Sequence, residues 1–240
     1  MALERMSPSR PAPGRSTAGR SATDRSSGRP PTSRREQRRL QHQDLSRNQL
    51  LDAAEEIFGA KGFHDTTLKE VAELAEFSVG SVYSFFQNKD DLYLNVFLRR
   101  GAEFLPGMEE AVAAGDTPTE QLHRLVDFEV GFFRRHRHFG RLYLRSANLG
   151  VMPPQLQADE QLQANVARAM EIQAGVFARG QETGELRDGD PYVLARMLSG
   201  LVATFQLLDP AIVGDGPDGG EGLPLQTLHE IVDGAFRRPD

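Results

Sequence analysis

The chain has 240 residues, which is enough for one large domain or two small ones with a substantial buried core. It contains no cysteine, which excludes disulfides and thiolate metal ligands. No stretch approaches the ~18 consecutive apolar residues of a membrane span, and the N-terminus lacks the apolar stretch of a signal peptide, so the sequence predicts a soluble, cytoplasmic protein that makes no membrane contact.

The formal net charge of −6 conceals a strong asymmetry along the chain. Residues 1–47 hold 11 Arg and 4 acidic residues, a net of +7, whereas the remaining residues hold 17 basic and 30 acidic groups, a net of −13. Such a division is typical of an arm that meets an anionic partner, most commonly nucleic acid. A solvated leader without a role is the alternative that composition leaves open.

The N-terminal stretch and the residues after it differ in kind. Residues 1–44 are rich in Arg, Ser and Pro and hold few large apolar side chains, so we expect a disordered tail there. The apolar period then becomes helical and predicts a first helix over Ser46–Lys61, ended by Gly62. Two helical domains are expected to follow the tail, over 45–92 and 93–238.

Three cap signals organise the first of these domains. Thr67 and Glu70 fit a capping box at the start of a second helix. Ser78 is a natural N-cap for a third helix that ends near Phe85, and Asn88 caps a longer fourth helix. Two short helices joined by a tight turn, with small polar residues at the start of the second, are typical of a helix-turn-helix.

Beyond Gly101 the pattern predicts further helices and no alternating β-strands, so the expected fold class is all-α: an N-terminal helix-turn-helix unit and a larger C-terminal helical bundle. The approximate spans are Thr119–His136, Phe139–Leu149, Asp159–Gln181, Pro191–Leu208 and Leu225–Arg237.

The predicted third helix combines small residues, which let the backbone approach DNA, with side chains suited to phosphate or thymine contacts. Tyr83 is a candidate for contact with a phosphate or a thymine methyl, Lys89 for a phosphate and Val79 for a thymine methyl. Val82 and Phe86 are expected to pack inward. The small residues expected on the DNA side are Ser78, Gly80, Ser81 and Ser84. Helix geometry alone leaves a plain helical hairpin as the alternative, with Tyr83, Phe85 and Phe86 in its core.

A set of residues at fixed spacing raises the DNA-binding hypothesis above that alternative. Their order and spacing match a known pattern without insertion or deletion. They are Ile57, Phe58, Gly62, Phe63, Thr66, Thr67, Val71, Ala72, Ala75, Ser78, Gly80, Tyr83, Phe86, Lys89 and Leu92. On these residues, 46–96 resembles the N-terminal DNA-binding domain of the tetracycline-repressor (TetR/AcrR) family.

That resemblance implies a transcriptional regulator that binds a palindromic double-stranded DNA operator as a homodimer. It implies release from DNA when a small ligand fills a pocket in the C-terminal helices, and it implies neither an enzyme nor a cofactor. By the family's pattern the residues facing DNA are Thr67, Ser78, Val79, Ser81, Tyr83, Ser84 and Lys89. Glu76 and Phe77 depart from the pattern, since they stand where the family usually has Gly and a small aliphatic residue.

The C-terminal bundle carries large apolar residues at helical spacing, which suit either a cavity for a small apolar or amphipathic ligand or an ordinary core. The candidate pocket residues are Phe104, Phe128, Phe132, Tyr143, Met170, Phe177 and Phe205. His136 and His138 diverge on a helix and have no matching further ligand, so we expect no metal site.

The last two predicted helices resemble the pair that this family uses for dimerisation. The segment Met197–Leu208 is apolar around much of its circumference and must be buried on more than one side. Ser199, Gly200 and Ala203 would permit close helix approach. Burial within one protomer is the alternative for this segment.

Two alternative classes of protein remain at the level of sequence: a helical enzyme and an all-α adaptor without DNA binding. The sequence shows no glycine-rich phosphate loop and no HExxH motif, which disfavours the enzyme.

Residues 48–101 hold 5 basic and 9 acidic groups, a net of −4 for a domain that is expected to bind a polyanion. We therefore expect the arginines at 34–35 and 38–39 to supply phosphate or minor-groove contacts.

Overall fold

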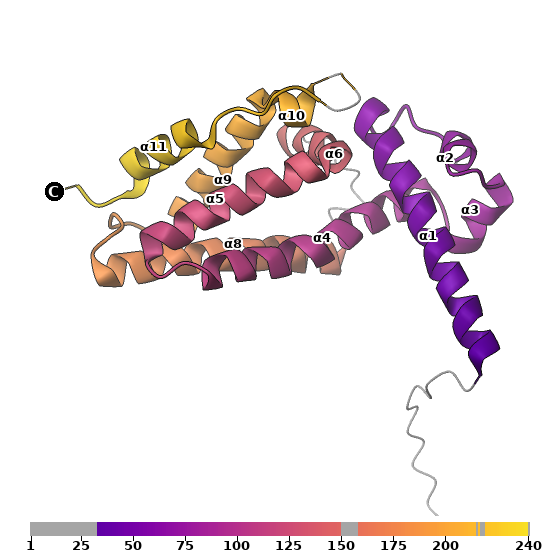
Figure 1. The fold of residues 1–240 in the computed structure, drawn as a ribbon, viewed down its shortest axis with the longest axis horizontal. Helices are drawn as coiled ribbons and strands as arrows, with labels where there is room; N and C mark the ends of the chain where they lie inside the picture. The colour runs from indigo at the N-terminus through magenta and orange to yellow at the C-terminus, as the bar shows by residue number, and fades with distance from the viewer. Residues whose placement is uncertain (1–32, 150–157, 215, 217–218, 240) are drawn as a thin grey trace, which may run out of the picture. The chain divides into compact units, whose positions relative to one another are not determined.

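The structure is a computed structural model that describes residues 33–149, 158–214, 216 and 219–239 (Figure 1). Within these residues the fold is all-α, as predicted, and the one β feature is an isolated bridge between Leu186 and Arg237. The helices are α1 (Arg34–Lys61), α2 (Leu68–Leu74), α3 (Val79–Phe85), α4 (Lys89–Ala113), α5 (Pro118–Arg135), α6 (Arg137–Leu149), α8 (Glu160–Thr183), α9 (Pro191–Leu208), α10 (Pro210–Val213) and α11 (Leu225–Phe236).

The predicted disorder of the tail is wrong for residues 34–44, because α1 begins at Arg34 instead of Ser46. Ser33 starts the helix, since its Oγ accepts a hydrogen bond from the Glu36 backbone N–H at 3.2 Å. The following residues are mostly Arg, Gln, Glu and Leu, which favour helix even where they bury nothing. Residues 33–41 form a unit apart from residues 42–240, and residues 1–32 lie outside the described residues.

The cap signals read from the sequence are confirmed in the helix-turn-helix region. Thr67 and Glu70 form both halves of a capping box at the start of α2. The Ser78 hydroxyl accepts from the Ser81 backbone N–H at 3.0 Å at the start of α3, and Asn88 Oδ1 accepts from the Asp91 N–H at 2.8 Å at the start of α4. These local bonds satisfy N–H groups that helix ends leave free.

One apolar cluster holds α1 to α4 together and continues into α6. Phe58, Val82 and Leu92 are fully buried in it, and Phe139 and Leu142 of α6 belong to the same cluster. Gly59 of α1 lies so close to α6 that a Cβ there would stand 2.5 Å from the His138 carbonyl oxygen. The helix-turn-helix core is therefore continuous with the start of the C-terminal bundle.

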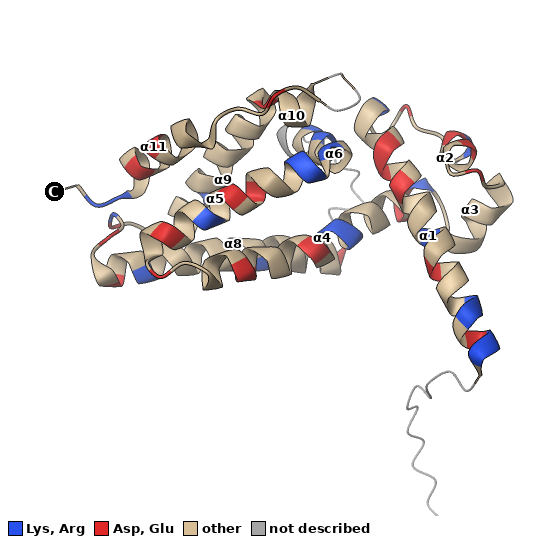
Figure 2. Ribbon diagram, in the orientation of Figure 1, with Lys and Arg blue, Asp and Glu red and all other residues tan. Residues whose placement is uncertain are grey.

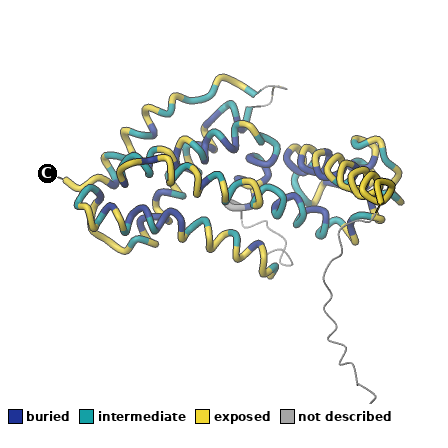
Figure 3. The backbone as a smooth tube through the Cα atoms, turned by 60° about the horizontal axis from the view of Figure 1, so that its bottom comes forward, coloured by how far each residue is buried: buried dark blue, intermediate teal, exposed yellow. Residues whose placement is uncertain are grey.

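The C-terminal bundle is built around α4, α5, α8 and α9, whose buried faces meet (Figure 3). The helix α4 continues through Gly101 and Pro106, so the predicted boundary at residue 92 falls inside a helix. Glycine is required at 107, because a Cβ would stand 2.2 Å from the Phe128 ring of α5. The helix α11 packs on α9 and α5, and the short α10, absent from the sequence-based prediction, packs on α6.

The helix α9 has the bounds that the sequence predicts. By length and composition it is apolar enough to cross a membrane, and 28% of it is buried within the chain. Polar residues interrupt it: Arg196, Ser199 and Gln206 belong to the lining of a cavity in the bundle. This pattern fits a bundle helix with one face left uncovered.

Candidate functional site

The side of α3 that faces solvent carries the side chains expected to meet DNA. Tyr83 is 58% exposed and Val79 is 36% exposed, whereas Val82 and Phe86 are buried at 0% and 1%. The alternative in which Tyr83 belongs to the core is therefore wrong. Phe86 is core, as predicted.

The short side chains of α3 and of the N-cap Ser78 project little from the backbone. Ser78 Oγ lies 2.8 Å from Ser81 Oγ, and Ser84 Oγ donates to the Ser81 carbonyl at 2.6 Å, so these hydroxyls stay close to the backbone. A Cβ at Gly80 would meet only Ser78 Oγ, at 3.7 Å. Thr67, also expected at the DNA, is exposed at the start of α2.

Lys89 does not have the free ammonium group that a phosphate contact requires. Its Nζ donates to the backbone carbonyls of Phe63, His64 and Thr66 at 2.8, 3.3 and 3.0 Å, and it lies 4.4 Å from the centre of the Phe63 ring. An ammonium group has three N–H donors, so all of them are used within the protein. Lys89 fastens the loop between α1 and α2 to the start of α4.

Glu76 stands in the turn between α2 and α3 with φ of 59°, in the left-handed region. Glycine adopts this conformation without cost, whereas a residue with a Cβ is strained there by roughly 1–2 kcal/mol. Glu76, in place of the glycine usual in the family, therefore adds backbone strain as well as a negative charge.

Lysines and arginines are interspersed with acidic residues on the helices of this region (Figure 2), and most of these cations are paired. Lys61 pairs with Glu70, and Arg99 pairs with Asp52 at 2.7 Å. Lys69, with its side chain 74% exposed, lies 3.6 Å from Glu73. The arginines at 34, 35, 38 and 39 are exposed on the first turns of α1.

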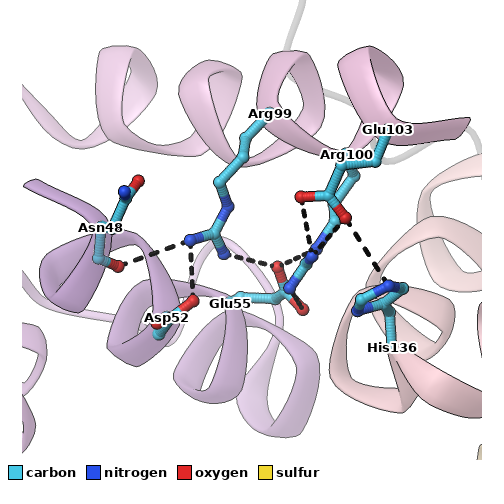
Figure 4. Close-up of polar contacts among 7 residues, drawn as sticks. All are labelled: Asn48, Asp52, Glu55, Arg99, Arg100, Glu103 and His136. Atoms are coloured by element: carbon cyan, nitrogen blue, oxygen red, sulfur yellow. Dashed lines mark hydrogen bonds and ion pairs between the residues drawn. The ribbon is translucent and has the colours of Figure 1, made fainter. Parts of the chain in front are cut away.

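A buried ion-pair cluster joins α1 to α4 (Figure 4). Glu55 of α1 has a side chain only 6% exposed, and both of its oxygens accept from Arg100 of α4, at 2.8 and 3.0 Å. Arg99 Nη2 donates to the same carboxylate at 2.9 Å. Arg100 also binds Glu103 at 2.9 Å, and Glu103 lies 3.6 Å from His136 Nε2. His136 ends α5, and burial and the nearby Arg100 charge lower its pKa.

A cavity of about 430 Å³, partly open to solvent, lies between α4, α5, α6, α8 and α9. Of the predicted pocket residues, Phe104, Tyr143 and Met170 line it. Four others do not. Phe128 packs on Gly107, and Phe132 packs on neighbouring rings. Phe177 lies fully buried against Phe236, and Phe205 packs against the apolar cluster that contains these two residues. The lining residues that the sequence analysis did not identify include Phe97, Arg100, Glu129, Phe133, Phe139, Gln173, Arg196 and Gln206.

The most unusual member of the cavity wall is a buried acid. Glu129 of α5 is 7% exposed, and its Oε1 accepts from Gln173 Nε2 of α8 at 2.8 Å. Ser199 Oγ of α9 donates to Gln173 Oε1 at 2.8 Å, so three helices contribute to one polar chain. Burial raises the pKa of Glu129 to about 7 despite the Gln173 hydrogen bond.

Comparison with known proteins decides the family. Residues 50–96 match the family model described as bacterial regulatory proteins, tetR family. The chain is also 24% identical over 153 residues to the fatty acid metabolism regulator protein of Bacillus subtilis (strain 168), with 62% of this chain and 75% of that protein covered. The chain is a TetR-family transcriptional regulator.

Solved structures show the same fold with different ligands. A transcriptional regulator from Saccharomonospora viridis, in complex with choline, has a TM-score of 0.66 at 17% identity and covers 82% of this chain and 100% of that one. The regulator FadR from Bacillus subtilis, in complex with stearoyl-CoA, has a TM-score of 0.62 at 21% identity and covers 78% of this chain and 95% of that one. At such identities the likeness shows the fold alone.

This TetR-family chain also leaves an apolar surface uncovered on its last two long helices. The exposed apolar residues there are Tyr192, Val193, Met197, Leu207 and Leu208 of α9 and Ile231 of α11. Ala203 and Ser199, expected to permit close helix approach, instead line the cavity. Gly200 also lines the cavity, but a Cβ there would meet nothing within 4 Å.

Proposed function

We propose that this TetR-family regulator is a cytoplasmic repressor that binds a palindromic operator as a homodimer. A small apolar or amphipathic ligand in the C-terminal cavity releases it from DNA. The observation that carries the proposal is the position of Arg100, which lines the cavity and also holds Glu55 of α1 through two hydrogen bonds. One side chain thus belongs to both the ligand cavity and the attachment of the DNA-binding domain.

The DNA contacts in this proposal come from α3, from its N-cap Ser78 and from the N-cap of α2, Thr67. Tyr83 and Val79 supply the largest exposed side chains, and the others are small enough for close backbone approach. The proposed DNA-facing residues are Thr67, Ser78, Val79, Gly80, Ser81, Tyr83 and Ser84. Lys89 acts in this proposal by positioning the loop before α2. The arginines at the start of α1 contribute phosphate contacts.

The exposed apolar face of α9 and α11 supports the homodimer. Two copies of this helix pair, related by a two-fold axis, would cover each other in a four-helix arrangement. The two α3 helices would then meet successive major grooves of a palindrome, about 34 to 36 Å apart. Dimerisation and operator binding are therefore expected to fail together.

Coupling between ligand and DNA is expected to run through the Glu55–Arg100 pair. A ligand changes DNA affinity only if it binds one arrangement of the protein better than the other. A ligand that alters the position of Arg100 changes the contacts that α1 makes with α4, and these contacts orient the helix-turn-helix. The relatives are regulatory DNA-binding proteins, which supports regulation over the enzyme and adaptor alternatives.

The experiment combines DNA binding with sedimentation. A palindrome from the DNA next to the gene is labelled, and its affinity for the full chain is measured by fluorescence anisotropy against a scrambled duplex. Met197→Asp places a charge at a side chain that is 58% exposed, and it is expected to abolish both the dimer and operator binding. A wild-type monomer that binds a single half-site tightly, or an operator bound no better than the scrambled duplex, would contradict the proposal.

A further inference from the structure

The buried acid of the cavity is satisfied only in part by the protein. Glu129 Oε1 accepts from Gln173, and the Gln173 amide is held in turn by Ser199, so both ends of that amide are used. Across residues 33–149 and 158–214, no side chain donates a hydrogen bond to Glu129 Oε2. Gln206 Nε2, the other nearby amide, lies 3.4 Å from the Glu129 backbone carbonyl instead. A buried carboxyl group thus lines the cavity with one acceptor oxygen open to a ligand.

Aromatic rings form a continuous part of the same wall. Phe133 lies near the middle, with ring centres 5.9 Å from Phe104, 5.9 Å from Phe139 and 5.2 Å from Tyr143. Phe97 extends the wall at 5.4 Å from Phe139. Ring faces attract organic cations, and they do so more strongly when water is excluded.

The other charged residues of the cavity lining have a weaker electrostatic effect on a bound ligand than Glu129 has. Arg100 is neutralised by Glu55 and Glu103, which occupy its guanidinium nitrogens. Arg196 lines the cavity from α9 but is exposed, so water screens its charge. Charge interactions are stronger in a buried, low-dielectric site, so the interior selects for a positive ligand over a negative one.

We propose that the ligand is an organic amine, whose protonated amino group binds Glu129 Oε2 while its apolar body lies against the aromatic wall. The inference rests on the proposed function, because it names the chemical class of ligand for that cavity. Burial raises the pKa of Glu129 to about 7, and a bound cation offsets the cost of ionising it there.

The test compares three probes with one apolar chain and different head groups: decylamine, decanol and decanoate. Their binding to the full-length protein is measured by isothermal titration calorimetry. Decylamine is expected to bind at least about ten-fold more tightly than either of the others, because its head group makes a charge-assisted hydrogen bond. Glu129→Gln is expected to lose about ten-fold in decylamine affinity and to keep decanol binding within about two-fold.

Glu110→Gln is the matched control, because it removes the same charge from an exposed position on α4. It is expected to bind decylamine like the wild type. Thermal melts of both variants check that they fold. Tighter binding of decanoate than of decylamine, unchanged decylamine binding by Glu129→Gln, or no binding of any probe would each overturn the amine assignment.

Anisotropy on the operator separates this inference from the proposed function. Decylamine that binds through Glu129 but leaves the protein on DNA would contradict ligand-released repression and leave the amine assignment standing. Release from DNA by decanoate, without an effect of decylamine, would support ligand-released repression and overturn the amine assignment.

Discussion

Replacing Glu129 with glutamine should remove a pH dependence of stability that the wild-type protein carries. The carboxyl group is buried, and its pKa rises from the ordinary value of 4.5 to about 7. The folded protein therefore binds more protons than the unfolded chain between these values. The stability contributed by the protonated group is fully present below pH 4.5 and is lost as pH rises through 7.

The size of this loss follows from the change in pKa. A rise of this size corresponds to about 3 kcal/mol of unfolding free energy between pH 4.5 and pH 8. Glutamine keeps the shape and an acceptor for the Gln173 amide, but it carries no proton that titrates. Tyr143 beside it has a pKa raised by burial and stays protonated across this range. The variant should therefore gain about 3 kcal/mol over the wild type as pH rises.

Urea denaturation followed by circular dichroism measures the difference at pH 5, 6, 7 and 8. Protein concentration is held constant, because the stability of the proposed homodimer depends on it. Glu110→Gln, which changes an exposed carboxylate, should show a free-energy difference from the wild type that varies little with pH. A Glu129→Gln difference that stays constant over the same range would refute the assignment of a buried, titrating acid.

Substitutions at four positions in the helix-turn-helix region test the assignments made there. Tyr83→Ala should weaken operator binding by about 1–3 kcal/mol in anisotropy without a change in melting temperature, and normal affinity would remove it from the DNA interface. Lys89→Ala should lower the melting temperature, since charged hydrogen bonds contribute about 1.5–3 kcal/mol; weaker DNA binding with an unchanged melt would restore its phosphate role. Glu76→Gly should stabilise the protein by about 0.5–1 kcal/mol in urea titrations, whereas Glu76→Ala, which keeps a Cβ, should not. Phe86→Ala should cost about 3–5 kcal/mol by calorimetry, and an unchanged melting curve would show that the side chain is not in the core.

Local signals explain why the helix-turn-helix could be predicted from sequence. Thr67, Ser78 and Asn88 act within four residues of themselves, so their spacing alone defines where helices start. The same reasoning was wrong for the start of α1. A high charge and few apolar residues predict disorder there, but helix propensity and the Ser33 cap decide the structure.

The role of Lys89 could not be read from its neighbours in sequence. Its partners are the backbone carbonyls of residues 63, 64 and 66, which α2 and α3 separate from Lys89 in the sequence. No side-chain pattern signals a carbonyl acceptor. Spacing placed Lys89 correctly at the start of α4, but only the folded chain shows which atoms its ammonium group meets.

The cavity shows a similar limit. Helical spacing indicates that Phe128, Phe132 and Phe133 point inward, but it does not say which inward residue meets a neighbour and which meets empty space. Only Phe133 of these lines the cavity. The sequence does contain one indication of the cavity. Glu129 interrupts the apolar run from Phe128 to Phe133, and an acid at such a position is seldom buried without a hydrogen-bond or ion partner or a function.

The cavity and the DNA-binding domain share side chains as well as an ion pair. Phe97 and Phe139 line the cavity, and both belong to the apolar cluster that holds α1 to α4 together. The Tyr93 hydroxyl in that cluster lies 2.8 Å from Ser146 Oγ of α6. Packed interiors do not deform gradually, so a ligand that displaces either ring must shift the cluster as a whole. Apolar packing and the Glu55–Arg100 pair thus connect the same two regions, and a variant that cuts only one of these connections is expected to retain part of the response to ligand.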